Sequence, residues 1–288
     1  MRFSWFPGHM RKALRELKER IPLADLVIFM MDARIPQSSI NPELEKYASN
    51  KRILYVMNKT DLASPSVTSS WVRYFREEGK SVVAVSSKKT KSLKPLSDKI
   101  DEIRGEIVEA RSRKGRIDSM VRAVAVGIPN SGKSTIINRL AGRAVAPAGK
   151  KAGLTRSLQW LPAGRNLEIL DMPGIFYPRL SGDDMAWRLA AVGAAREVSF
   201  PVDDLAFEIL LFLKARGHEF VEGMPDSSAE EALGFAGRKN NFILSGGRID
   251  YDRAAMWIVT NFRDGKMGAY SLEFPPSKKA GDSSVSSD

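Results

Sequence analysis

Apolar and polar residues along the first two thirds of the chain follow two alternating patterns. Short, mainly apolar runs at residues 26–31, 52–57, 81–85 and 121–126 predict buried strands. Stretches with apolar residues three and four apart precede and separate these runs and predict amphipathic helices, the first of them at residues 7–21. Strands that are apolar throughout and alternate with helices indicate a parallel α/β sheet with helices on both faces.

The pattern changes after Pro178, where only helical spacing remains. Four helices are predicted there, at residues 183–198, 203–216, 228–235 and 252–262. The final residues are too polar to form a core and are expected to be disordered. We therefore expect an α/β domain at residues 1–178, a small all-α domain at 179–275 and a disordered tail at 276–288.

Charge is distributed unevenly along the 288 residues, whose net charge is +11. Residues 1–178 hold 32 Lys and Arg against 17 Asp and Glu, whereas residues 179–288 hold 13 against 17. The excess predicts a polyanionic partner such as nucleic acid, contacted mainly by basic segments 11–20, 111–116 and 139–165. A basic protein without such a partner would have the same composition.

Two absences narrow the class of protein. The chain has no cysteine, which excludes disulfides, thiolate zinc sites and cysteine nucleophiles and favours a reducing, cytoplasmic location. The apolar run Leu26 to Met31, as long as any in the chain, is far too short to span a membrane. We therefore expect no membrane partner.

A phosphate-binding loop follows the strand predicted at 121–126 and opens a helix. The spacing Gly-x-x-x-x-Gly-Lys-Ser places backbone N–H groups around phosphates, a lysine beside the β and γ phosphates and a hydroxyl on Mg²⁺. The residues of this loop are Gly127, Ile128, Pro129, Asn130, Ser131, Gly132, Lys133, Ser134 and Thr135.

Two further motifs predict recognition of guanine. Asn58-Lys59-Thr60-Asp61 ends a strand, and a carboxylate there can accept both the N1–H and the 2-amino group of guanine, a donor pair that adenine lacks. Ser86-Ser87-Lys88 ends the next strand and fits a loop that backs the base. A polar turn after a strand is the alternative for each, because Asn, Asp and Ser are common in turns.

Asp171-Met-Pro-Gly174 also ends a strand, and it predicts contacts to the metal and the γ-phosphate. Asp171 can hold Mg²⁺ through water, and the Gly174 N–H can contact the γ-phosphate. Thr155 is the candidate switch threonine and, with Ser134 and Asp171, completes the expected Mg²⁺ ligands. GTP or GDP with Mg²⁺ is therefore the expected ligand.

These five elements form a GTPase signature in rotated order, since the guanine motifs precede the phosphate loop. The sequence resembles a circularly permuted Ras-like GTPase, an arrangement that a sheet tolerates because the pocket needs spatial neighbours rather than chain order. It is similar in particular to the ribosome biogenesis GTPase A (RbgA/YlqF) family. The resemblance is carried by Trp5-Phe-Pro-Gly-His-Met10, Asp32-Ala-Arg-Ile-Pro36, the phosphate loop through Thr135, Asp171-Met-Pro-Gly-Ile175 and Asn261-Phe-Arg-Asp-Gly-Lys-Met-Gly268.

The resemblance implies a GTP-hydrolysing factor for late assembly of the large ribosomal subunit, binding rRNA and expected to be monomeric. It also implies a slow hydrolase that the subunit stimulates, with His9 as the catalytic residue. Ile175 follows the Asp-Met-Pro-Gly motif and cannot orient water as a glutamine would. The alternative for His9 is a structural histidine in the N-terminal turn. Similarity to related GTPases further implies that Asn130 helps hold K⁺.

Other classes of function remain open from the residues alone. A GTPase switch with a protein or membrane-targeting partner would share these motifs. An RNA-binding module with a vestigial pocket is a third possibility, although Lys133, Ser134, Asp171, Asn58 and Asp61 are all intact.

Overall fold

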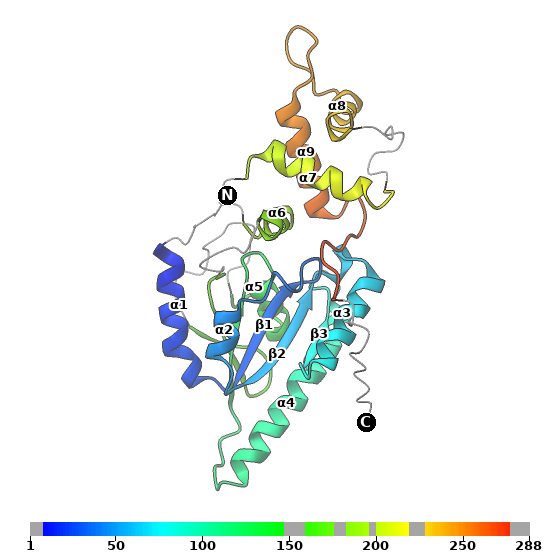
Figure 1. The fold of residues 1–288 in the computed structure, drawn as a ribbon. Helices are drawn as coiled ribbons and strands as arrows, with labels where there is room; N and C mark the ends of the chain where they lie inside the picture. Colours follow the sequence, from blue (N-terminus) through cyan, green and yellow to red (C-terminus); the bar gives the residue numbers. More distant parts are fainter. Residues whose placement is uncertain (1–7, 147–158, 176–182, 196–199, 219–227, 277–288) are drawn as a thin grey trace, which may run out of the picture.

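A single sheet forms the centre of the molecule in a computed structural model that describes residues 8–146, 159–175, 183–195, 200–218 and 228–276 (Figure 1). Its strands lie in the order β3-β2-β1-β4-β6-β5. All adjacent pairs are parallel except β5 with β6. The strands are β1 Leu26–Asp32, β2 Arg52–Asn58, β3 Val82–Ala84, β4 Val121–Gly127, β5 Trp160–Pro162 and β6 Leu167–Asp171. The predicted parallel α/β class is confirmed, and the carboxyl ends of the parallel strands meet at one edge.

Helices cover both faces of this sheet, because successive side chains of a strand point to opposite sides. Val27, Phe29 and Met31 of β1 pack with the helices of one face, and Leu26, Ile28 and Met30 pack with those of the other. The first face carries α1 Gly8–Arg20, α2 Pro42–Tyr47 and α3 Pro65–Glu77, and the second carries α4 Lys94–Ser112 and α5 Lys133–Ala141.

Helix α1 confirms the helix predicted at residues 7–21. Ala13 and Leu17 are buried, and Ile21 is buried in the short 3-10 turn that leads into β1. Because α1 joins β1 at the amino edge of the sheet, its own amino terminus lies toward the carboxyl edge. Its 13 residues span roughly 20 Å, similar to the roughly 23 Å of the seven-residue β1.

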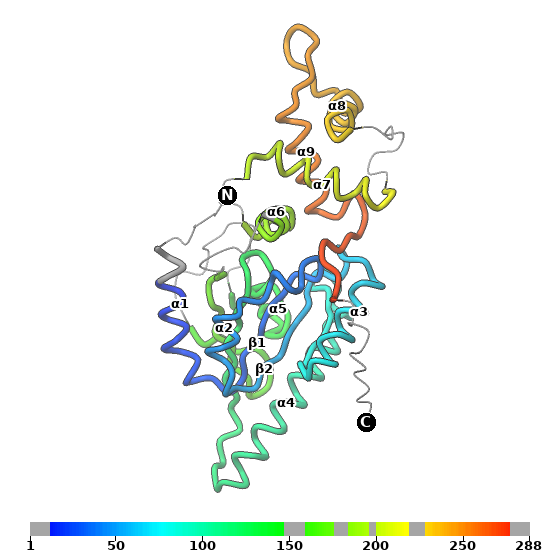
Figure 2. The backbone as a smooth tube through the Cα atoms, in the orientation of Figure 1, coloured from blue at the N-terminus to red at the C-terminus, as the bar shows by residue number. Residues whose placement is uncertain are grey.

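The remaining helices form a bundle above the carboxyl edge of the sheet (Figures 1 and 2). They share one apolar core, to which the α/β part contributes Ile35 and Ile128. After the last helix the chain returns to the sheet, where the Leu272 N–H donates to the Arg34 carbonyl at 2.8 Å. The helices are α6 Asp183–Ala191, α7 Val202–Lys214, α8 Ala229–Lys239 and α9 Tyr251–Asp264.

Several boundaries differ from those that the sequence pattern predicts. Helix α6 ends at Ala191 rather than at residue 198, because the Gly193 N–H bonds to the Ala190 carbonyl and the Ala194 N–H to that of Leu189, a Schellman ending. Strand β3 has three residues rather than the five predicted at 81–85. Helix α2 and the Ile243–Ile249 bridge were not predicted.

Some predictions fall outside the described residues. They concern Thr155, part of the basic segment 139–165, the boundary at residue 178 and the tail after residue 276. The division of the chain at residue 178 and the disorder of the tail therefore stay predictions.

Candidate nucleotide-binding site

The phosphate loop lies where the sequence predicted it, between the end of β4 at Gly127 and the start of α5 at Lys133. The Lys133 ammonium is buried and donates to the carbonyls of Gly127 at 3.2 Å and Ile128 at 3.0 Å. Burial lowers the pKa of Lys133 to about 8, while the charge of Asp171 acts in the opposite direction. Burial removes the water that would stabilise this positive charge, and the negative charge of a bound phosphate would stabilise it instead.

Residues suited to Mg²⁺ come together beside this loop. The Ser134 hydroxyl, in the first turn of α5, donates to an Asp171 carboxylate oxygen at 2.6 Å, and Asp171 ends β6 within the buried sheet edge. Within the described residues no three Asp, Glu or His side chains form a metal-holding group. The two oxygens fit an ion that takes its other ligands from water and phosphates, as Mg²⁺ usually does.

The loop after β6 packs directly against the phosphate loop. A Cβ added to Gly174 would lie 2.6 Å from Pro129 Cα, so only glycine allows this approach. The Ile175 N–H donates to the Gly127 carbonyl at 3.1 Å, and its side chain is buried in the core on the α1–α3 face. Ile175 is therefore a core residue in this structure.

Asn58 joins three of the predicted loops. Its side chain is fully buried, donates to the Ser131 carbonyl at 2.8 Å and accepts from the Ser87 N–H at 2.9 Å. Both ends of the amide are satisfied by loops that follow different strands, β4 and β3. The phosphate loop and the two predicted guanine loops are therefore fixed relative to one another.

Asp61 lies at the open side of this arrangement, in a 3-10 turn after β2. Its carboxylate accepts from the Ser86 hydroxyl at 2.6 Å and pairs with Lys88 at 3.1 Å. Burial acts to raise the pKa of Asp61, but the bonds from Ser86 and Lys88 outweigh it and lower the pKa. The carboxylate is therefore ionised at neutral pH and suited to accept two N–H groups from one edge of a base.

Lys59 adopts a left-handed backbone conformation (φ 64°) and pairs with Asp32 at 2.9 Å. Asp32 also binds Arg34 at 2.8 Å. The sequence assigned no role to Asp32 or Arg34. The sequence did contain a signal for a role of Asp32, because this residue follows a predicted strand, as Asp171 does. In the structure Asp32 ends β1 opposite Asn58 of β2, and Asp171 ends β6.

The structure thus brings together the phosphate loop, both predicted guanine loops, Asp171 and Gly174. His9 lies in the first turn of α1 rather than in a turn before the helix, and its side chain is outside the described part. Asn130, the proposed K⁺ ligand, uses its side-chain N–H to donate to the Gly193 carbonyl at 2.6 Å, which leaves its amide oxygen as the possible ligand.

Comparison with known proteins agrees with this geometry. Residues 122–222 match the family model described as 50S ribosome-binding GTPase. The chain is 37% identical to ribosome biogenesis GTPase A of Bacillus pumilus over 96% of this chain and 100% of that one. The protein of that name from Thermotoga maritima is 33% identical, with 94% of each chain covered. A GNP-bound YlqF from T. maritima superposes with a TM-score of 0.63 at 30% identity, covering 92% of this chain and 98% of that one.

The strand order and loop positions define a circularly permuted GTPase domain, in which β4, the strand that carries the phosphate loop, follows the guanine-loop strands β2 and β3 in sequence and is separated from β2 in the sheet by β1 alone. The chain belongs to the ribosome biogenesis GTPase A family. The expected fold class and the hydrolysis of GTP are thereby confirmed.

The contact between Gly132 and Asn58 yields a matched pair of variants. A Cβ at Gly132 (φ 92°) would collide with the Asn58 side-chain nitrogen, whereas a Cβ at Gly142 (φ 67°) would meet nothing within 4 Å. Both glycines have left-handed φ, so alanine strains both backbones, but only Gly132→Ala separates the loops. We expect Gly132→Ala to weaken GDP binding by roughly tenfold or more and Gly142→Ala to leave it nearly unchanged, as measured by fluorescence titration. Equal losses would contradict the proposed role of this contact.

Proposed function

We propose that this protein is an assembly factor for the large ribosomal subunit that binds GTP or GDP with Mg²⁺, hydrolyses GTP and contacts rRNA in a nucleotide-dependent way. The observation that carries the proposal is the meeting of four of the five nucleotide motifs at one sheet edge, in a chain whose relatives are named for ribosome biogenesis. A monomeric state and a cytoplasmic location complete the proposal.

In the proposed pocket, Asp61 accepts the N1–H and 2-amino groups of guanine. Asn58 and Lys59 hold the surrounding loops, and Ser86-Ser87-Lys88 back the base. The partly buried, ionised carboxylate of Asp61 and its bonds to Ser86 and Lys88 support this assignment.

The phosphates lie against residues 127–135 in this proposal, with the Lys133 ammonium beside them. Ser134, Asp171 and Thr155 are the proposed Mg²⁺ ligands, directly or through water. When bound, the ion would neutralise charge on the phosphates. The 2.6 Å bond between Ser134 and Asp171 supports the first two ligands.

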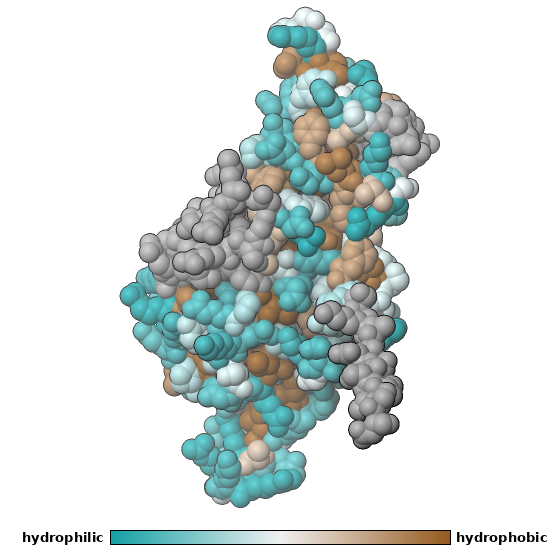
Figure 3. Space-filling model, viewed as in Figure 1, coloured by the Kyte–Doolittle hydropathy of each residue, from teal (hydrophilic) through white to brown (hydrophobic). Residues whose placement is uncertain are grey.

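Helix α1 is the basic segment to which we assign sensing of the nucleotide. Lys12, Arg15 and Lys18 are exposed on it, while Leu17 packs into the same apolar cluster as Ile175, beside the γ-phosphate loop. Figure 3 shows a mainly hydrophilic surface in this region. The 111–116 segment lies at the end of α4, where the chain enters β4 at the amino edge of the sheet, away from the pocket.

Catalysis is assigned to His9, and part of the charge compensation to K⁺ held by Asn130. The first turn of α1, which includes His9, lies toward the carboxyl edge of the sheet, and this direction supports the proposal. An imidazole there can position or deprotonate the attacking water. The Asn130 amide oxygen is available because its N–H group bonds to Gly193.

The alternative is a GTPase switch with a protein or membrane-targeting partner. Among the described residues, no helix is both long enough and apolar enough to cross a membrane. Sedimentation of the protein with purified large subunits, with GDP or with a GTP analogue, separates the two proposals. Failure to sediment in either state would favour the alternative.

The position of α1 predicts how its charges contribute. Reversal of Lys12 and Arg15 to Glu should weaken subunit binding, flatten its salt dependence by about two units of log–log slope and remove the difference between nucleotide states. The matched variant reverses Lys114 and Arg116, an equal charge change at the far edge, and should keep that difference. Co-sedimentation over a salt series measures both. Loss of the nucleotide dependence in the second variant alone would contradict the role of α1.

The proposed role of His9 predicts a selective loss of turnover. His9→Ala should leave GTP affinity within a few-fold and lower subunit-stimulated hydrolysis by about 10²–10⁴ if His9 is a general base, and by less if it only positions water. Single-turnover assays with saturating subunits compare wild type and variant. An unchanged rate would return His9 to a structural role.

A further inference from the structure

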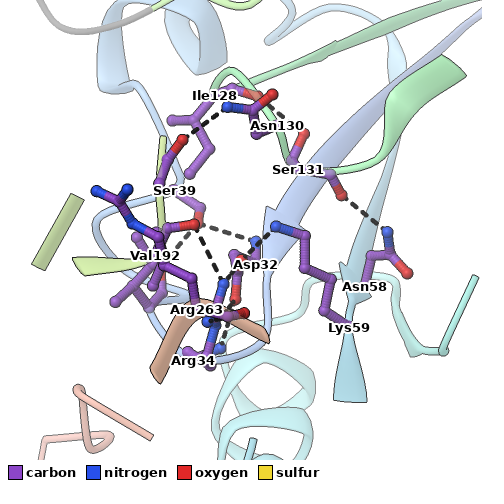
Figure 4. Close-up of polar contacts among 12 residues, drawn as sticks. Asp32, Arg34, Ser39, Asn58, Lys59, Ile128, Asn130, Ser131, Val192 and Arg263 are labelled. Carbon is purple, nitrogen blue, oxygen red and sulfur yellow. Dashed lines mark hydrogen bonds and ion pairs between the residues drawn. The ribbon is translucent and has the colours of Figure 1, made fainter. Parts of the chain in front are cut away.

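A buried charge cluster lies between the predicted guanine motif and the helical bundle (Figure 4). The Asp32 carboxylate, fully buried at the end of β1, binds the Arg34 guanidinium through both oxygens, at 2.9 and 2.8 Å. The Lys59 ammonium reaches the same carboxylate at 2.9 Å. One buried carboxylate thus holds two cations, one of which belongs to the motif Asn58-Lys-Thr-Asp61.

The energetics of burial make this cluster hard to rearrange. Burial acts to raise the pKa of Asp32, but the positive charges of Arg34 and Lys59 outweigh it and hold that pKa well below its usual range. Loss of the carboxylate charge would leave two cations partly desolvated without a counter-ion, an arrangement that is strongly unfavourable. Asp32 therefore fixes where the Lys59 side chain lies.

Lys59 in turn lies close to the phosphate loop. The neighbouring Asn58 donates to the Ser131 carbonyl of that loop at 2.8 Å. Burial is the main cause that lowers the pKa of Lys133, and the positive charge of Lys59 acts in the same direction. Like charges repel, so the counter-charge of Asp32 favours the position of Lys59 beside the pocket. The Asp32–Lys59 pair holds it against that repulsion.

The Arg34 guanidinium also forms hydrogen bonds with the helical bundle. Its guanidinium donates to the carbonyl of Val192 at 3.3 Å, just after α6, and to that of Arg263 at 3.4 Å, in the last turn of α9 (Figure 4). Carbonyls at the end of a helix lack partners within it and carry partial negative charge, so they favour cationic donors.

The end of α6 receives two further contacts. The Arg263 guanidinium donates to the Ala190 carbonyl at 2.7 Å, and the Asn130 side chain of the phosphate loop donates to the Gly193 carbonyl. One turn of the bundle therefore contacts Arg34 from the cluster and Asn130 from the phosphate loop.

We propose that Asp32 is a positioning residue that holds the Lys59 side chain in the guanine pocket. Through Arg34 it also couples binding of the nucleotide to the packing of the end of α6 against the α/β part. Asp32 does not contact the nucleotide itself. The inference rests on the proposed guanine pocket, and GDP is the probe that tests it without any ribosomal component.

The first test is a double-mutant cycle on GDP affinity, measured by calorimetric titration. Asp32→Asn should weaken GDP binding by roughly tenfold, within the range of coupling between contacting charges. If Asp32 acts through Lys59, the double variant Asp32→Asn/Lys59→Met should bind GDP within about twofold of Lys59→Met alone. If the loss of GDP affinity in the double variant equals the product of the losses in the two single variants, Asp32 has a merely structural role and the proposal is overturned.

The matched control is Glu273→Gln. Glu273 is also a buried carboxylate between the bundle and the α/β part, where it accepts from the backbone N–H groups of Gln37 and Ser38. In the described part of the structure its carboxylate contacts Gln37, Ser38 and Arg188, and not Lys59, so its variant should lower thermal stability while GDP affinity stays within about twofold. A tenfold loss of GDP affinity in Glu273→Gln would show that any weakened contact between the bundle and the α/β part lowers nucleotide affinity.

A second measurement remains decisive if Asp32→Asn does not fold. Arg34→Met leaves the Asp32–Lys59 pair intact and removes the hydrogen bonds to the carbonyls of Val192 and Arg263. GDP should slow hydrogen exchange at the amides of residues 192–194 in wild type, and this protection should be lost in Arg34→Met while GDP affinity changes by no more than a few-fold. Retained protection would overturn the coupling. Wild-type protein that binds ADP as tightly as GDP would instead refute the proposed pocket.

Discussion

The buried amide of Asn58 is the interaction on which the pocket depends. It bonds to Ser131 and Ser87 at the same time, and these residues follow different strands of the sheet. A buried amide that lost either partner would carry the full cost of desolvation, so the three loops are stable only in this mutual arrangement. Asp61, Lys133 and Asp171 can then face one ligand, because each extends from a loop or strand end at the same edge.

This arrangement explains why chain order is unimportant to the domain. The strand that carries the phosphate loop, β4, lies beside β1 and β6, and β1 pairs with β2 so that Asp32 is opposite Asn58. The sheet needs these neighbours and not a particular connection between them. In this chain the last strand of the domain leads toward the helical bundle, whose core includes Ile35 and Ile128 from the α/β part. Pocket and bundle therefore share side chains.

The sequence was sufficient for the features that local pattern encodes. Apolar strands, amphipathic helices and the spacing of Gly127, Gly132 and Lys133 each lie within a few residues, and the fold agrees with them. The contacts of Arg34 with Val192 and Arg263 join positions 158 and 229 residues apart, and no local spacing signals them. Helix α6 was predicted too long for a related reason, since its apolar composition continues past the Gly193 ending that backbone hydrogen bonds create.

The guanine loops after β2 and β3 and the phosphate loop after β4 form one guanine-specific pocket in this interpretation, and Asp61 is the group that recognises the base. The most direct measurement is the affinity of wild type and Asp61→Asn for GDP and for xanthosine diphosphate, which presents a carbonyl where guanine has its amino group. The account predicts that wild type prefers GDP and that the variant, which offers an N–H donor in place of a carboxylate oxygen, reverses the preference. An unchanged preference for GDP in a folded Asp61→Asn variant would contradict it.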